Sequence, residues 1–161
     1  MEEQLVSVVV PAYNTEKYIS DMLYCLENQT YKNIQMIFVD DGSTDGTAQI
    51  IRNAAAIDKR IEYYFQKNQG VSAARNFGIT KVRGEKLFFF DSDDTFEFNL
   101  VEECMRYAKA NSVQSVLYGY ADKKDGKIEK EHKFHIHGKF EGGCSPKHNA
   151  SLFGTFVCRY Q

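Results

Sequence analysis

The 161-residue sequence contains no tryptophan, only two prolines and no long apolar run. No stretch approaches the roughly 20 apolar residues that a membrane-spanning helix needs, so we expect no membrane segment in this chain. Proline is scarce and 43% of the residues are hydrophobic, so no segment has the composition of a disordered region. The formal net charge is only −2, which provides no general attraction to nucleic acid or to anionic lipid. We therefore expect a globular protein with enough chain for one domain.

Motifs for several common chemistries are also missing. The four cysteines are widely spaced without a CxxC pair, which is typical of reduced thiols in a cytosolic protein rather than of a zinc site or a disulfide framework. Gly42 and Gly46 form neither a dinucleotide fingerprint nor a phosphate loop, and no serine lies in the Gly-x-Ser-x-Gly setting of a nucleophile. His135 and His137 share one face of an expected strand, but two histidines at this spacing are more often a surface feature than a metal site.

The periodicity of apolar residues alternates between strands and helices. Strands are expected near 5–11, 34–39, 61–65, 86–90 and 113–120, and helices near 15–29, 45–57, 71–81 and 98–110. This alternation predicts an α/β fold with a mostly parallel sheet flanked by helices. Thr15 is expected to cap the first helix, and Thr44 or Asp45 the second. After Tyr120 a charged Asp-Gly turn at 125–126 predicts a hairpin or edge strand.

Three carboxylates occupy the four positions 91–94, directly after an apolar run. When ionised, Asp91, Asp93 and Asp94 repel one another and raise one another's pKa. A divalent cation would relieve this repulsion, and ligands that are all oxygen favour Mg²⁺ or Mn²⁺ over zinc. The alternative is a solvated acidic turn that begins a helix.

Polar side chains follow two other expected strands. The acidic pair Asp40-Asp41 comes after the second strand, and the segment Pro11-Ala12-Tyr13-Asn14 ends the first. Ligands of open α/β sheets bind in the crevice beyond the carboxyl ends of the strands. These groups can therefore converge with residues 91–94 on a single site.

The segment from Asn68 to Asn76 joins the third strand to the third helix, and Gly70 permits a tight entry into that helix. Arg75 lies in the first turns of the helix, where the helix dipole does not favour a cation. An anionic partner is therefore expected. It is either a ligand phosphate or a carboxylate such as Asp91 or Asp93, and the two alternatives are compatible.

Taken together, these motifs resemble those of family 2 glycosyltransferases of the GT-A fold. The resemblance covers about residues 5–120 and rests on four segments in order: Val6 to Asn14, Val39 to Thr47, Asn68 to Asn76 and Phe90 to Asp94. It implies metal-dependent, inverting transfer of a sugar from a nucleotide-diphosphate sugar, expected to be a UDP-sugar, to an acceptor hydroxyl. Such a hexosyltransferase-like reaction would belong to polysaccharide or cell-wall biosynthesis.

The resemblance also implies roles for individual residues on the nucleoside side. Pro11, Tyr13 and Asn14 would line the nucleoside pocket, and Asp41 would accept a hydrogen bond from the base. The residues near the ribose and the diphosphate would be Asn68, Gly70 and Arg75.

By the same resemblance, Asp91, Ser92 and Asp93 correspond to the family's DXD motif. Asp93 would bind Mn²⁺ or Mg²⁺, Asp91 would face the ribose or sugar, and Asp94 would lie close to the metal. All three carboxylates are therefore candidate metal ligands.

The second half of the chain departs from the family pattern. The general base and the acceptor-binding elements usually follow there, often in an acidic Glu-Asp type motif, and Glu129, Glu131 and Glu141 lack the matching surroundings. We therefore expect residues 1–120 to form the nucleotide-sugar-binding core and 121–161 to begin a truncated acceptor-side region. This makes a donor-binding fragment without transfer activity an alternative. A receiver-type signalling domain is a further one, although its acidic pair would follow the first strand.

The expected partners are a nucleotide-sugar donor and a glycan or lipid-linked acceptor, with no nucleic acid. The acidic start, Met1-Glu2-Glu3, does not resemble a signal peptide. A cytoplasmic location is therefore expected, or the inner face of the membrane for the full-length protein.

Overall fold

The computed structural model describes residues 4–112, 116, 118, 120–124, 127–132 and 158–159. Its strands are β1 (Val6–Ala12), β2 (Ile34–Asp40), β3 (Ile61–Phe65), β4 (Lys86–Phe89), β5 (Tyr120–Lys124), β6 (Lys127–His132) and β7 (Cys158–Arg159). Its helices are α1 (Ile19–Glu27), α2 (Thr47–Ile57), α3 (Val71–Ile79) and α4 (Leu100–Asn111). None of the helices in the described ranges is long and apolar enough to cross a membrane.

The main sheet has the strand order β3-β2-β1-β4-β7, in which the first four strands are parallel and β7 is antiparallel to β4. The expected α/β fold with a mostly parallel sheet is confirmed. In the register, Val9 at the centre of β1 lies between Ile37 of β2 and Phe89 of β4. The chain proceeds outward from β1 in both directions, so the topological switch point lies between β1 and β4. Ligand crevices of open α/β sheets form at such points.

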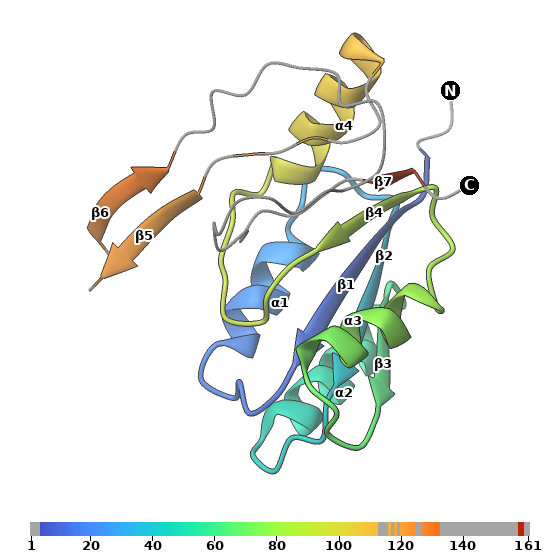
Figure 1. The fold of residues 1–161 in the computed structure, drawn as a ribbon, viewed down its shortest axis with the longest axis vertical. Coiled ribbons are helices and arrows are strands. Elements are labelled where there is room, and N and C mark those ends of the chain that lie inside the picture. Colours follow the sequence, from blue (N-terminus) through green and yellow to red (C-terminus); the bar gives the residue numbers. More distant parts are fainter. Residues whose placement is uncertain are drawn as a thin grey trace.

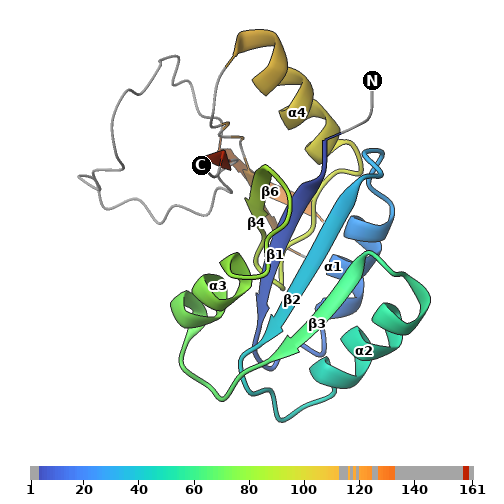
Figure 2. The same cartoon turned by 90° about the vertical axis from the view of Figure 1, so that its right-hand side faces the viewer.

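Helices cover both faces of the sheet, with α3 on one side and α1 and α2 on the other (Figures 1 and 2). Every residue of β1 and β2 is buried, as expected for central strands with helices on both faces. On the α3 side, Gly78 faces Val9, and a Cβ built on Gly78 would lie 2.4 Å from the Val9 Cγ1 atom. The missing side chain therefore lets α3 approach the sheet closely.

Two helices begin later than the sequence predicts. Instead of capping α1 with its side chain, Thr15 accepts hydrogen bonds at its carbonyl from the amides of Tyr18 and Ile19, so the capping prediction is wrong. The second helix starts at Thr47, whose amide donates to Asp45 Oδ1 at 3.0 Å. The Asp45 side chain therefore stabilises the start of α2 from a position two residues before the helix.

The predicted hairpin after residue 120 is confirmed, because β5 and β6 pair in antiparallel fashion, with a bulge at Asp122/Lys123. The strand expected over 113–120 is only partly described: Val116 and Tyr118 are not in a strand, and β5 begins at Tyr120. His135, His137 and Glu141 lie outside the described residues.

Candidate functional site

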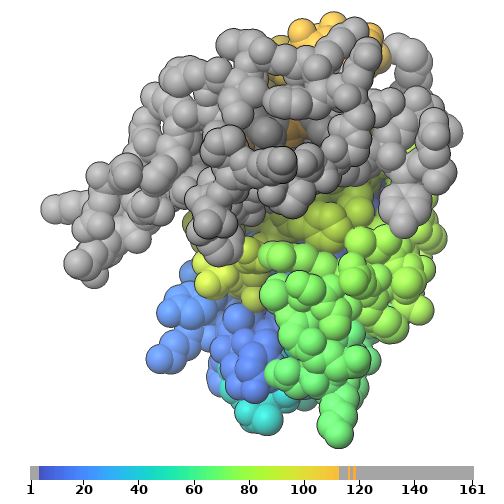
Figure 3. Space-filling view, viewed as in Figure 1, coloured from blue at the N-terminus to red at the C-terminus, as the bar shows by residue number. Residues whose placement is uncertain are grey.

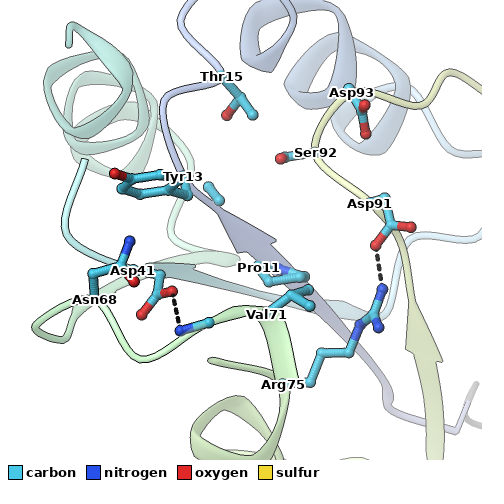
Figure 4. A pocket seen from close by; sticks show the side chains of 12 residues that line it. Pro11, Tyr13, Thr15, Asp41, Asn68, Val71, Arg75, Asp91, Ser92 and Asp93 are labelled. Carbon is cyan, nitrogen blue, oxygen red and sulfur yellow. Dashed lines mark hydrogen bonds and ion pairs between the residues drawn. The ribbon is translucent and has the colours of Figure 1, made fainter. Parts of the chain in front are cut away.

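A pocket of about 580 Å³ lies at the carboxyl edge of the sheet, over the switch point between β1 and β4 (Figure 4). Four chain segments contribute to it: the end of β1, the turn after β2, the entry to α3 and the loop after β4. Its lining residues are Pro11, Ala12, Tyr13, Thr15, Asp41, Asn68, Gly70, Val71, Arg75, Asp91, Ser92 and Asp93. The structure therefore brings polar residues from several strand ends together at one site, as expected.

Asp41 lies buried at one end of this pocket, with 3% of its surface exposed. Its Oδ1 atom accepts hydrogen bonds from Gln66 Nε2 (2.7 Å) and from the Gln69 amide (2.9 Å), and its Oδ2 atom accepts one from the Gly70 amide (2.8 Å). Gly70 has a φ of 89°, a left-handed conformation that glycine adopts at little cost. A carboxylate offers about four acceptor positions, so one remains for a ligand N–H.

Beside Asp41, Tyr13 and Asn68 border the same end of the pocket (Figure 4). The Tyr13 side chain is a large hydrophobic group that remains 49% exposed. An exposed aromatic ring next to a buried acceptor can pack against a flat heterocycle while the acceptor bonds its edge. This end of the pocket is therefore suited to an aromatic base.

At the other end, Arg75 reaches from α3 and donates a hydrogen bond to Asp91 Oδ1 (Figure 4). The predicted pairing of this arginine with a carboxylate of the loop is thus present. Both side chains are only partly buried, with 35% and 21% of their surfaces exposed. Arg75 therefore lines the pocket with positive charge while it holds the start of the acidic loop, which we define as residues 90–99 between β4 and α4.

Within the acidic loop, Ser92 is buried with 5% of its surface exposed, whereas Asp93 is exposed and lines the pocket. Asp94 is not among the lining residues, and its amide donates to the Asp91 carbonyl at 3.1 Å. Although Asp94 as a residue is exposed, partial burial of its carboxyl group and the neighbouring Asp91 and Asp93 carboxylates raise its pKa to about 6. The Asp91 and Asp93 carboxylates thus contribute to this rise at Asp94, after burial.

The predicted ligand set Asp91, Asp93 and Asp94 does not form a ready-made cluster, since no group of three carboxylate, imidazole or thiolate side chains within the described ranges could hold a metal ion. The chemistry of the donors nevertheless fits Mg²⁺ or Mn²⁺. Mg²⁺ is usually bound by one or two carboxylates together with ligand phosphates and water. Asp93, an exposed carboxylate at the pocket, satisfies this requirement.

Asn14 lies outside the pocket lining, although the resemblance placed it there. It has a φ of 52°, its amide donates to Ser43 Oγ at 3.0 Å, and its Oδ1 atom accepts the Thr44 amide at 2.8 Å. Thr15, in turn, donates its amide to Thr47 Oγ1 at 2.9 Å. In the structure, Asn14 thus joins the loop after β1 to the loop after β2, next to Tyr13.

Sequence reasoning did not single out Thr15 and Val71 as pocket residues, nor Gln66 and Gln69 as partners of Asp41. Thr15 lies one residue beyond the predicted motif 11–14, and Val71 directly follows Gly70. Their position next to motif residues is the feature of the sequence that could have identified them as pocket residues. Gln66 lies two residues before Asn68 and Gln69 directly after it. Gln66 bonds Asp41 through its side chain and Gln69 through its backbone amide, which no sequence motif indicated.

The model of the Glycosyl transferase family 2 matches residues 7–158 of the chain. An uncharacterized glycosyltransferase of Haemophilus influenzae is 38% identical over 122 residues, which cover 75% of this chain and 49% of that protein. The match decides against the receiver-type alternative.

Two solved structures share the fold. Staphylococcus aureus TarS 1–349, in complex with UDP-GlcNAc, is 26% identical with a TM-score of 0.65, covering 76% of this chain and 36% of TarS 1–349. The mannosyltransferase PcManGT from Pyrobaculum calidifontis, in complex with GDP-Man and Mn²⁺, is 23% identical with a TM-score of 0.65, covering 73% and 36%. This chain spans less than half the length of each of these three proteins.

Proposed function

The chain belongs to glycosyl transferase family 2, and we propose that its pocket binds a nucleotide-diphosphate sugar, with a UDP-sugar as first choice. The full-length protein would transfer the sugar to an acceptor hydroxyl on a glycan or a lipid-linked acceptor. The observation that carries the proposal is the order of groups along the pocket. The aromatic ring of Tyr13 and the buried carboxylate of Asp41 lie at one end, and Arg75 and Asp93 lie at the other.

The Tyr13 end fits the nucleoside. The remaining acceptor position of Asp41 would bind a base N–H, and the exposed face of Tyr13 would pack against the ring. Pro11 and Val71 lie between this end and Arg75 (Figure 4), and the ribose would be there, within reach of Asn68 and Gly70. The complex of TarS with UDP-GlcNAc supports uracil as the base.

The Arg75 end fits the diphosphate. A guanidinium forms strong charge-assisted hydrogen bonds with phosphate oxygens, and Arg75 is already oriented by Asp91. Asp93 would hold Mn²⁺ or Mg²⁺, with Asp91 and Asp94 nearby in the same loop. When bound there, the metal would supply a Lewis acid that neutralises charge on the diphosphate leaving group. The complex of PcManGT with Mn²⁺ supports the choice of cation.

Inversion by direct displacement also requires a base that deprotonates the acceptor hydroxyl. Asp41, Asp91 and Asp93 are the acidic residues that line the pocket in the described part of the chain, and all three lie on the donor side of the proposal. We therefore assign the base to none of them. This is consistent with a division in which residues 1–120 bind the donor.

Calorimetric titration of UDP with and without Mn²⁺ tests the proposal. The wild-type chain should bind UDP more tightly with Mn²⁺, and Asp93→Ala should lose this metal-dependent gain, about tenfold or more, because its ligand oxygens are gone. Asp21→Ala, which removes an exposed carboxylate of α1 outside the pocket, is the matched control and should bind like the wild type.

Absence of UDP binding under every condition, or an unchanged metal effect in Asp93→Ala, would contradict the proposal. Binding of a UDP-sugar without its transfer to any acceptor would instead identify the chain as the donor-binding fragment.

A further inference from the structure

Gln29 is a fully buried polar residue that lies outside the proposed site, two positions after the end of α1. Its Nε2 atom donates to the Cys25 carbonyl (3.2 Å) and to the Glu97 carbonyl (2.8 Å), and its Oε1 atom accepts the Val101 amide (3.1 Å). Both amide hydrogens and one acceptor position of the side chain are therefore used. Two of these three bonds lead to the far end of the acidic loop.

The bond to Val101 replaces a missing helix cap. The helix α4 begins at Leu100, and the preceding residue, Asn99, makes no side-chain capping bond. The first amides of a helix have no partner inside the helix, and a cap that satisfies one of them stabilises the helix start. Gln29 provides this cap from another part of the chain, 72 residues away in sequence.

Other contacts hold the same stretch against the region of α1. The Thr30 amide donates to the Phe98 carbonyl at 2.7 Å, and the rings of Tyr24 and Phe98 meet edge to face with centroids 5.7 Å apart. Nearer the pocket, Phe96 stacks on Phe90 with centroids 4.1 Å apart. Figure 3 shows the yellow atoms of the loop directly beside the blue atoms of the segment that contains α1.

Asp91 to Asp94 lie in the sequence between the stacked residues Phe90 and Phe96. They include Asp93, the carboxylate proposed to bind the metal. Only three residues separate Asp93 from Glu97, whose carbonyl Gln29 holds. A change at Glu97 therefore alters the conformations that are available to Asp93. Groups that hydrogen-bond a metal-ligating side chain directly typically affect metal affinity by about tenfold to a hundredfold, and Gln29 would act on Asp93 through the backbone of the loop.

We propose that Gln29 is a positioning residue that fixes the acidic loop so that Asp93 meets the metal and diphosphate. This deepens the proposed function and rests on it. The bonds of Gln29 hold the loop end at α4, Arg75 holds the loop start at Asp91, and the pocket carboxylate lies between the two.

A matched pair of variants tests the proposal. Gln29→Met nearly conserves volume and removes all three bonds. Gln35→Met is the control, because Gln35 is also buried (2% exposed) and fully bonded, but its partners are Ser7, Glu62, Lys81 and Arg83 rather than the acidic loop. Both substitutions should cost stability to a similar degree. Titrations of UDP into the full chain are made with and without Mn²⁺ for the wild type and both variants.

In Gln29→Met, UDP affinity in the presence of Mn²⁺ should fall by about tenfold or more, while metal-free affinity stays unchanged, because the nucleoside end does not depend on the loop. Gln35→Met should change neither value. Equal losses of affinity in the two variants would overturn the proposal, because the loss would then follow from disturbing any buried glutamine. No loss in Gln29→Met would overturn it as well, because the bonds of Gln29 would then not affect the metal site.

Hydrogen exchange separates this proposal from the proposed function. In the wild type the Val101 amide should be protected, although amides at a helix start usually exchange fast. Gln29→Met should speed exchange over residues 94–103, and Gln35→Met should not. Fast exchange of Val101 in the wild type would overturn the positioning role. If the wild type shows no Mn²⁺-dependent UDP binding, the proposed function fails, and the exchange data alone decide whether Gln29 holds the loop.

Discussion

The guanidinium of Arg75, on α3, donates a hydrogen bond to the carboxylate of Asp91, two residues beyond the end of β4. This contact joins the first turns of α3 to the start of the acidic loop, at the topological switch point between β1 and β4. Within the described residues the buried Nε atom of Arg75 has no hydrogen-bond partner. A guanidinium carries five N–H donors, so Arg75 can keep its bond to Asp91 and still bind an anion in the pocket.

Arg75→Ala should weaken UDP binding by about tenfold or more, because a hydrogen bond to a charged group contributes about 1.5 to 3 kcal/mol. Binding of uridine, which lacks the diphosphate, should stay unchanged. Arg75→Lys should recover only part of the loss, because an ammonium cannot reproduce the planar fork of donors. Calorimetry with UDP and uridine measures both effects. The control is Arg106→Ala, which removes an exposed arginine paired with Glu103 on α4. Equal losses for uridine and UDP would mean that Arg75 acts on the pocket shape and not on the diphosphate.

The sheet and the position of the site were predictable from the sequence because both depend on local patterns. Apolar runs such as 34–39 form strands that are buried on both faces, and the polar groups that follow them must lie at the same edge when the strands are parallel. The acidic pair at 40–41 and the acids at 91–94 therefore indicated the pocket before its geometry was known.

The beginnings of the helices were less predictable, because distant residues determine them. Thr15 has the side chain of a typical cap, but its amide bonds Thr47, 32 residues away, and α1 begins only at Ile19. Asn14 and Thr44 are similarly joined across 30 residues. Capping preferences describe a local competition, and here contacts between two loops decide it.

The role of Gln29 had no signal in the sequence. A single glutamine after an amphipathic helix is usually an exposed residue. Its burial follows from the packing of α4 and the acidic loop near α1, and this packing involves residues about 70 positions away.

Gly78→Ala should destabilise the fold by about 1 to 3 kcal/mol, the usual cost of overpacking a core. The new Cβ would lie 2.4 Å from Val9 Cγ1 and 3.3 Å from Val39 Cγ2, so α3 or the sheet would have to shift. Urea unfolding measures the change. The control is Asn76→Ala on the exposed face of α3, where alanine favours the helix and stability should not fall. An unchanged midpoint for Gly78→Ala would show that α3 moves away from the sheet at no cost, and the close packing would then have no role in stability.

Glu62 should make the stability of the protein depend on pH in the acid range. Partial burial opposes its ionisation, but hydrogen bonds from Arg83 (2.5 Å), Tyr64 (2.8 Å) and Gln35 (3.2 Å) lower its pKa in the folded state. In the unfolded chain the pKa of a glutamate is about 4.3. Because the folded pKa is the lower one, the stabilisation is complete above the unfolded pKa and is lost as the pH falls through the folded pKa.

Glu62→Gln should therefore be less stable than the wild type at neutral pH, and the difference should shrink as the pH falls below about 4. Urea unfolding at a series of pH values down to about 3 measures this difference. Glu85→Gln, which alters an exposed glutamate two residues after Arg83, should differ little from the wild type at any pH. A difference between Glu62→Gln and the wild type that stays constant with pH would assign the effect to lost packing or neutral hydrogen bonds, because only the ionised carboxylate can produce the pH dependence.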